Sequence, residues 1–322
     1  MLPEPFRNAV VLTGPTACGK TALALELAEH LSAEIIAMDS MTVYRGMDIG
    51  TAKPSPVERQ RVPHHLIDVR EPRESANVAW WLEQARECAL AIAGRRKRVL
   101  FVGGTALYLK ALLKGLFEGP GADATLRNKL QTEAETVGSE VLHARLAQVD
   151  PSTAARLHPN DLRRIIRALE VWQITGRPLS DWHQQWRSSL ARHASEEHPL
   201  LARRANNPGN LVWLDLPRAE LYRRIEERVD RMFALGFVEE VQRLKTQPHP
   251  PGREARQALG YKEVFDLLDG KQSLAQTVAT IKTRTRNFAK RQLTWFRNMP
   301  ECRPCRPQRP ELTFTIHDLT IS

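Results

Sequence analysis

Residues 9–21 read Ala9-Val-Val-Leu-Thr-Gly-Pro-Thr-Ala-Cys-Gly-Lys-Thr21, an apolar run that leads into a short loop. The loop, residues 14–21, matches the pattern G-x-x-x-x-G-K-[S/T] in full. The apolar run before it predicts a buried strand, and leucines at helical spacing in 21–31 predict a helix after it. A strand, this loop and a helix, in that order, form the context in which the pattern binds phosphate groups. Residues 9–31 therefore predict a phosphate-binding loop in an α/β domain.

The residue types of this loop suit a ligand that carries several phosphates. Glycines allow the backbone to fold around an anion, and the N-terminus of the following helix favours negative charge. Lys20 would neutralise phosphate charge, and the hydroxyl of Thr21 would coordinate Mg²⁺. The predicted diphosphate-binding residues are Gly14, Pro15, Thr16, Ala17, Cys18, Gly19, Lys20 and Thr21. The motif is a nucleotide-binding one, yet it does not specify ATP, so kinases, NTPases and transferases that cleave a diphosphate all remain open.

Apolar runs and helical patterns alternate along much of the rest of the chain. Strand-like runs lie at 35–38, 99–102 and 211–216, and helical patterns at 78–92, 218–235 and 273–298. Strands that alternate with helices predict a parallel sheet. The predicted fold class is therefore α/β, a P-loop NTPase-like parallel sheet flanked by helices.

Between Gly121 and Asn206 the character of the sequence changes. Helical patterns at 123–136, 140–148, 161–175 and 179–190 follow one another with no convincing strand. We therefore predict an all-helical insertion domain at 121–206, a catalytic core formed by 1–120 and 207–300, and a C-terminal tail at 301–322.

The chain has 322 residues and a formal net charge of +10, from 47 Lys and Arg against 37 Asp and Glu. This balance favours a partner rich in phosphate. No apolar run approaches the roughly 18 residues of a membrane span, and the N-terminus lacks the pattern of a signal peptide. Four cysteines are too few for a disulfide framework. We therefore expect a cytoplasmic protein that does not associate with membranes, and we expect a monomer.

Two polar segments follow predicted strands, where ligands of open α/β sheets bind. Asp39-Ser40 ends the second strand, and Gly103-Gly104-Thr105 ends the third. Asp39 would lie near the phosphates, where it could bind Mg²⁺ through water or accept a proton from a substrate. A turn or helix-capping aspartate is the alternative interpretation. The small polar residues of 39–54 are more typical of a substrate loop than of a core.

Several blocks together resemble the tRNA dimethylallyltransferase (tRNA isopentenyltransferase) family, in its bacterial form. The blocks are the loop at 14–21 and the segments at 39–54, 63–68, 102–110, 158–171, 259–263 and 289–295, in the order of the family. The resemblance implies transfer of a dimethylallyl group from dimethylallyl diphosphate to the exocyclic amine of the adenosine just 3′ of the anticodon, with Mg²⁺ and without ATP. The sequence departs from the family at Ala106 and in the stretch 192–207.

The resemblance also implies a role for individual residues. Lys20, Asp39, Thr105 and Arg224 would be catalytic, with Asp39 as general base, Arg224 on the leaving diphosphate and Thr21 on Mg²⁺. The implied contacts with the tRNA anticodon stem-loop are made by Asp39, Ser40, Met41, Thr42, Thr105, Arg127, Arg163, Arg164, Ile165, Ile166 and Arg167. Helical spacing places Arg228 and Arg231 on the face of Arg224, although ion pairs with Glu220 and Glu227 would also explain them.

Other residues have mainly structural interpretations. Trp182 and Trp186 form an i, i+4 pair that suits core packing more than base stacking. We expect His64 and His65, which precede a strand-like run at 66–68, to be structural. Cys302 and Cys305 are a lone pair, with only His317 nearby, and a structural zinc site needs four ligands.

Three other functions fit parts of the sequence. A P-loop kinase for a small molecule would use Asp39 as its base, but it would leave the basic helical insertion without a purpose. An adenylate isopentenyltransferase, which modifies free AMP, ADP or ATP, would not need the arginines of that insertion. A non-catalytic RNA-binding protein would not need the intact residues Lys20, Thr21 and Asp39.

Overall fold

The structure, a computed structural model, describes residues 5–116, 119–182 and 210–307. The chain divides into two compact units, one formed by Met1–Leu113 with Asn206–Ser322 and one by Lys114–Ala205. The predicted insertion domain, 121–206, falls almost wholly in the second of these ranges. No helix in the described part of the chain is long and apolar enough to cross a membrane.

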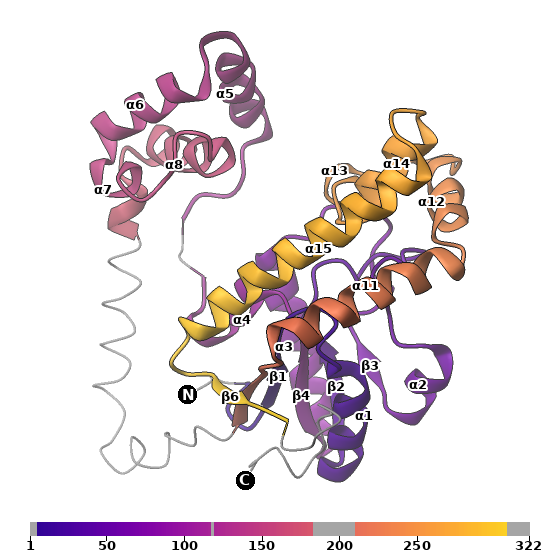
Figure 1. The fold of residues 1–322 in the computed structure, drawn as a ribbon. Helices are drawn as coiled ribbons and strands as arrows, with labels where there is room; N and C mark the ends of the chain where they lie inside the picture. Colours follow the sequence, from indigo (N-terminus) through magenta and orange to yellow (C-terminus); the bar gives the residue numbers. More distant parts are fainter. Residues whose placement is uncertain (1–4, 117–118, 183–209, 308–322) are drawn as a thin grey trace, which may run out of the picture. The chain divides into compact units, whose positions relative to one another are not determined.

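The first unit is built on one six-stranded sheet with the strand order β3-β2-β4-β1-β5-β6, in which every pair of neighbours is parallel (Figure 1). The strands are β1 (Val10–Thr13), β2 (Ala33–Ala37), β3 (His64–His65), β4 (Arg98–Gly103), β5 (Leu211–Leu214) and β6 (Arg303–Cys305). Parallel strands need crossover connections, and the helical patterns between the strands supply them. The predicted fold class is confirmed by this sheet.

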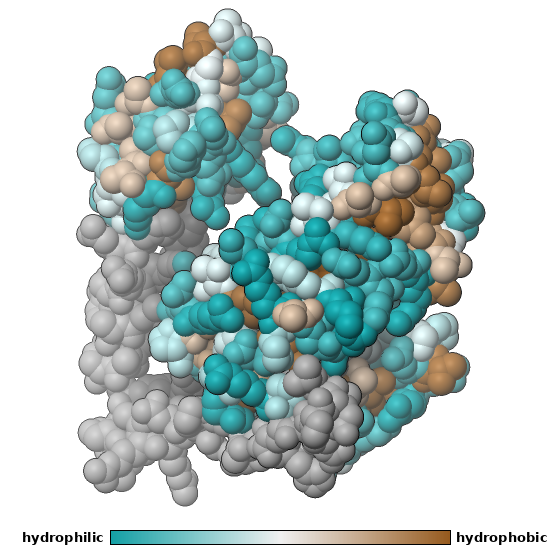
Figure 2. All heavy atoms as spheres, in the orientation of Figure 1, coloured by the Kyte–Doolittle hydropathy of each residue, from teal (hydrophilic) through white to brown (hydrophobic). Residues whose placement is uncertain are grey.

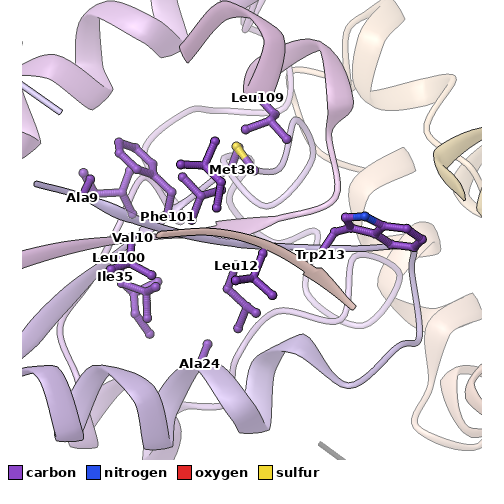
Figure 3. Close-up of a cluster of buried hydrophobic side chains, with 14 of the residues drawn as sticks. Ala9, Val10, Leu12, Ala24, Ile35, Met38, Leu100, Phe101, Leu109 and Trp213 are labelled. Carbon is purple, nitrogen blue, oxygen red and sulfur yellow. The ribbon is translucent and has the colours of Figure 1, made fainter. Parts of the chain in front are cut away.

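The helices of this unit pack on the sheet and on one another. They are α1 (Lys20–Leu31), α2 (Pro56–Arg61), α3 (Val78–Gly94), α4 (Ala106–Lys114), α11 (Arg218–Ala234), α12 (Phe237–Lys245), α13 (Arg253–Arg256), α14 (Tyr261–Leu268) and α15 (Leu274–Arg297). Figure 3 shows Leu12 and Ile35 pointing toward Ala24 of α1, whereas Phe101 points to the opposite side of the sheet, where Leu109 of α4 lies. Because both faces are covered, every residue of β1 and β2 is buried, and all of them except Thr13 and Glu34 are apolar.

Two short edge strands depart from the sequence prediction. The strand β6 lies within 301–322, so the prediction that this stretch is a tail outside the core is wrong for Arg303–Cys305. The strand β3 is His64–His65 itself and not the predicted run at 66–68. The backbones of Leu66 and Asp68 have φ values of 61° and 57°, in the left-handed region, and these values end the strand.

The second unit is all-helical over its described residues. Its helices are α5 (Ala124–Val137), α6 (Ser139–Val149), α7 (Pro151–Ala154) and α8 (Leu162–Thr175). Its core includes Leu130, Leu142, Leu146, Ile165 and Leu169, all 0–1% exposed. Residues 179–182 are also helical. The rest of the predicted helix 179–190, together with Trp186, the stretch 192–207 and His317, lies outside the described residues.

Candidate active site

The phosphate-binding loop follows β1 directly and ends where α1 begins. The backbone takes φ values of 146° at Gly14 and 95° at Gly19, which glycine adopts without strain, and 64° at Ala17. The first turn of α1 has no side-chain cap, so its N–H groups are left for an anion. Lys20 Nζ lies over the loop and donates to the carbonyl oxygens of Gly14 (2.9 Å) and Pro15 (2.7 Å).

Gln292, which was not among the predicted site residues, connects this loop to the end of β4. Its Oε1 accepts the backbone N–H of Thr16 (2.9 Å), and its Nε2 donates to the carbonyl oxygen of Gly104 (2.8 Å). Gln292 is buried on α15 and lines the same pocket as the loop. The signal available in the sequence was the block 289–295, which contributed to the family resemblance without a reason for this glutamine.

Asp39 and Thr105 lie next to each other beyond the ends of β2 and β4. The hydroxyl of Thr105 accepts the backbone N–H of Ser40 (3.3 Å), and Asp39 Oδ1 accepts the N–H of Met41 (2.8 Å). A Cβ at Gly103 would lie 2.0 Å from the carbonyl oxygen of Met38, so only glycine lets these strand ends approach so closely. The turn interpretation of Asp39 is therefore correct for one of its oxygens, and the residue also lines the pocket described next.

A pocket of about 1240 Å³ opens at this edge of the sheet, within the first unit. Predicted site residues that line it are Thr16, Ala17, Gly19, Lys20, Thr21, Asp39, Thr42 and Arg224. Apolar side chains that the sequence analysis did not single out also line it: Ile35, Ile49, Ile67, Val102, Met232, Leu235 and Phe288. Thr105 is not among the lining residues and reaches the site only through its bond to Ser40. The pocket thus combines a phosphate-binding end with apolar walls.

Arginines of α11 face this pocket. Arg224 Nε is held by Glu220 (2.5 Å), and its Nη1 lies 3.6 Å from the position of a Cβ on Gly19. Arg223 takes the other contacts of Glu220 and also pairs with Glu227. Hydrogen bonds from Arg223 and then Arg224 lower the pKa of Glu220 to about 2. Glu220 and Glu227 are therefore already paired, and the ion pairs considered for Arg228 and Arg231 do not form.

The wall formed by residues 48–54 is pinned from two sides. The buried carboxylate of Glu240 on α12 accepts the backbone N–H groups of Asp48 (3.0 Å), Ile49 (2.7 Å) and Gly50 (3.2 Å). The side chain of Lys53, only 2% exposed, bonds Asp48 and Asp68. Lys53, a basic residue of the predicted substrate loop, thus holds the shape of the wall.

A magnesium ion would find oxygen ligands here only with the help of a substrate. The described residues contain no group of three or more His, Cys, Asp or Glu placed to hold a metal. Mg²⁺ bound to phosphates typically takes just one or two protein ligands, and Thr21 and Asp39 line one pocket. In Cys302, just before the edge strand β6, burial and then Glu301 raise the pKa of the thiol to about 12.

The residues predicted to contact RNA in the second unit have different environments. Arg127 and Arg167 both bond the fully buried Glu170, and Arg167 also bonds the carbonyl oxygen of Pro120. Ile165 and Ile166 are buried, which removes their side chains from the predicted contact. The two remaining arginines of that prediction, at positions 163 and 164, are exposed.

The histidines and Trp182 keep to their structural interpretations. His64 Nδ1 contacts the carbonyl oxygen of Val62 (2.7 Å), and His65 Nε2 contacts Glu34 (2.7 Å). Trp182 packs against the core of the second unit.

Comparison with known proteins relates the chain to one family. The sequence profile described as IPP transferase matches residues 42–299. The chain is 48% identical over 310 residues to tRNA dimethylallyltransferase 1 of Trichlorobacter lovleyi, with 96% of each chain covered. It is also 48% identical over 301 residues to tRNA dimethylallyltransferase of Geobacter metallireducens, with 94% of this chain and 93% of the relative covered.

Solved structures agree with this relationship. The full-length tRNA isopentenylpyrophosphate transferase of Bacillus halodurans matches with a TM-score of 0.63 and 38% identity, covering 92% of this chain and 89% of that one. A eukaryotic dimethylallyltransferase acting on tRNA matches with a TM-score of 0.66 and 28% identity, covering 89% of this chain and 69% of that one.

Proposed function

The chain belongs to the IPP transferase family, and from that premise we infer that it is a tRNA dimethylallyltransferase. It transfers a dimethylallyl group from dimethylallyl diphosphate to the exocyclic amine of the adenosine 3′-adjacent to the anticodon and releases diphosphate. The observation that carries the proposal is the pocket in which the phosphate-binding loop, Asp39 and apolar walls meet. Its phosphate end suits the diphosphate, and its apolar side chains suit a five-carbon chain.

The chemistry makes two demands on the protein. The exocyclic amine of adenine is a weak nucleophile, because its lone pair is conjugated with the ring, so bond breaking to diphosphate must be assisted. Preorganised positive charge at Lys20 and Arg224, with the N–H groups of the loop, stabilises the negative charge that develops on the leaving group. The amine becomes acidic as it bonds to carbon, and Asp39 accepts its proton. Mg²⁺, bound by Thr21, would supply further positive charge at the phosphates.

The RNA partner adds a demand of its own. A base stacked in an anticodon loop cannot reach a pocket at the edge of the sheet, so the adenosine must leave its stack. Ser40, Met41, Thr42 and Thr105 surround Asp39 in sequence or space and would contact the flipped nucleotide, while exposed arginines of α8 would contact phosphates. We propose that the protein acts in the cytoplasm as a monomer.

Two alternatives make different experimental predictions. A small-molecule kinase would need ATP, and an adenylate isopentenyltransferase would accept AMP in place of tRNA. The test is incubation with labelled dimethylallyl diphosphate and Mg²⁺, with tRNA, AMP or no acceptor, in the presence and absence of ATP. We expect label in tRNA without ATP. Label in AMP alone, or product only when ATP is added, would refute the proposal.

A further inference from the structure

Arg228 is a positive charge in the pocket that has no partner in the described part of the chain. It is half-buried on α11, one helical turn after Arg224, and it lines the pocket together with Lys20 and Asp39. No hydrogen bond or ion pair joins it to any described residue, whereas Arg223 and Arg224 on the same helix both pair with Glu220. Figure 1 shows how α11 runs alongside α15, the helix that carries Gln292.

The surroundings of Arg228 make this arrangement costly without an anion. Burial lowers the pKa of Arg228, and the carboxylate of Asp39, just beyond the end of β2, opposes this shift. A guanidinium keeps its charge at any physiological pH, so the cost of burying it cannot be relieved by losing a proton. Buried charges in proteins are normally paired, and an unpaired one indicates a ligand of opposite charge.

The position of Arg228 also distinguishes it from the arginines on the outer surface of α11 and α15. The outer surface over α11 and α15 is largely hydrophilic, as Figure 2 shows, and the arginines there are solvated or paired with acids. Arg228 instead lines the same pocket as the loop and interacts electrostatically with Asp39. An anion seated on the loop would therefore share this pocket with the guanidinium.

We propose that Arg228 binds the diphosphate group of the prenyl substrate, as a second arginine beside Arg224. The inference rests on the proposed function and extends it. A planar guanidinium offers two parallel N–H donors to phosphate oxygens, which a lysine cannot reproduce. Arg228 makes this contact both with the bound substrate and with the departing diphosphate, so its loss weakens substrate binding and slows turnover.

The test uses inorganic diphosphate as the probe, with purified Arg228→Gln, Arg228→Lys and Arg218→Gln. Arg218 is exposed at the start of α11, contacts Tyr222 and does not line the pocket, so it is a matched control. For Arg228→Gln we expect roughly 10–100-fold weaker binding of inorganic diphosphate, the effect of one charged hydrogen bond. Arg228→Lys should recover only part of this loss, and Arg218→Gln should bind like the wild type.

A thermal denaturation series separates this role from a structural one. Without ligand, Arg228→Gln should melt at or above the wild-type temperature, because it removes a half-buried charge that has no partner among the described residues. With saturating diphosphate, its melting temperature should rise less than that of the wild type. A lower melting temperature without ligand, or unchanged diphosphate affinity, would overturn the proposal. Lower kcat with unchanged diphosphate affinity would also overturn it, since Arg228 would then act on Asp39.

The proposed function can fail independently of this inference. If the wild type binds diphosphate but transfers no dimethylallyl group to tRNA, the assigned reaction is wrong. The weaker diphosphate binding of Arg228→Gln would still stand in that case, because the probe needs neither the prenyl chain nor the RNA.

Discussion

Replacing Arg127 by Gln should destabilise the helical unit and leave its affinity for RNA phosphates almost unchanged. The carboxylate of Glu170, which is 0% exposed, accepts two hydrogen bonds from Arg127 (2.8 and 2.9 Å), one from Arg167 (2.6 Å) and one from the backbone N–H of Asp123 (2.7 Å). The guanidinium of Arg127 is therefore bound to Glu170, although the side chain is 42% exposed and its type and position on a basic helical domain favour an RNA contact.

The magnitude follows from what remains after the substitution. Removing one partner of a buried ion pair costs about 3–5 kcal/mol when the other charge is left alone. Glu170 would keep Arg167 and the N–H group of Asp123, so we expect the smaller cost of about 1.5–3 kcal/mol that is typical of hydrogen bonds to a charged group. Arg163→Gln is the matched control, because Arg163 is exposed and makes no ion pair or hydrogen bond with the described residues.

Two assays distinguish the two arginines. Hydrogen exchange of the amides in 119–182 should quicken in Arg127→Gln and stay unchanged in Arg163→Gln. Titration with tRNA at several salt concentrations should show the reverse, with the slope of log K against log[salt] reduced by about 0.7–0.9 in Arg163→Gln for one lost phosphate contact. Unchanged exchange in Arg127→Gln together with a flatter salt slope would refute the assignment of Arg127 to Glu170.

Three further predictions concern the kinetics of the active site, the packing at Gly50 and the acid response of the helical unit. Asp39→Asn retains an oxygen for the N–H of Met41 and should lower kcat by roughly 10²–10⁴-fold with little change in substrate affinity. Lys20→Ala should weaken prenyl diphosphate binding as well as lower kcat, and steady-state kinetics with both substrates distinguish these two effects. Gly50→Ala places a Cβ 2.4 Å from the rings of Phe237 and Tyr261. It should lower the free energy of unfolding, measured by urea denaturation, by about 1–3 kcal/mol. Burial raises the pKa of Glu170, but hydrogen bonds from Arg127 and Arg167 outweigh burial and hold the pKa below its usual value. The ionised Glu170 therefore stabilises the folded protein fully above about pH 4.5, and this contribution is lost as the pH falls through the lowered pKa. The melting temperature of Glu170→Gln should depend less on pH below about 4.5 than that of the wild type.

The central strands and the phosphate-binding loop could be predicted because their signals are local. A strand buried on both faces is mostly apolar, and the loop motif joins one such strand to a helix within residues 9–21. The edge strands β3 and β6 could not be predicted, because two or three residues are too few to show a period. They exist because the neighbouring strands offer free N–H and C=O groups, which is a tertiary cause.

The candidate site shows the same division. Asp39 and Lys20 belong to motifs, the role of Arg224 was implied by the family resemblance, and the structure brings all three to one pocket. Gln292 escaped notice because its two bonds reach loops 276 and 188 residues away, and nothing near it in the sequence signals either. The pairing of Arg127 could not be predicted for a related reason. The sequence does not distinguish an arginine that pairs with a buried carboxylate, here that of Glu170, 43 residues away, from one that binds a phosphate.

Residues 9–54, which contain the recognisable motif, therefore form only part of the pocket. Residues 9–54 supply the loop, Asp39 and a wall, but that wall is held by Glu240, and the loop is held by Gln292. The cations that would share the pocket with the anion come from α11. A phosphate-binding loop by itself grips a diphosphate in the same way for a kinase or a transferase. The residues around the loop must therefore determine which reaction takes place. In this chain they are Asp39, the apolar wall of the pocket and the arginines of α11.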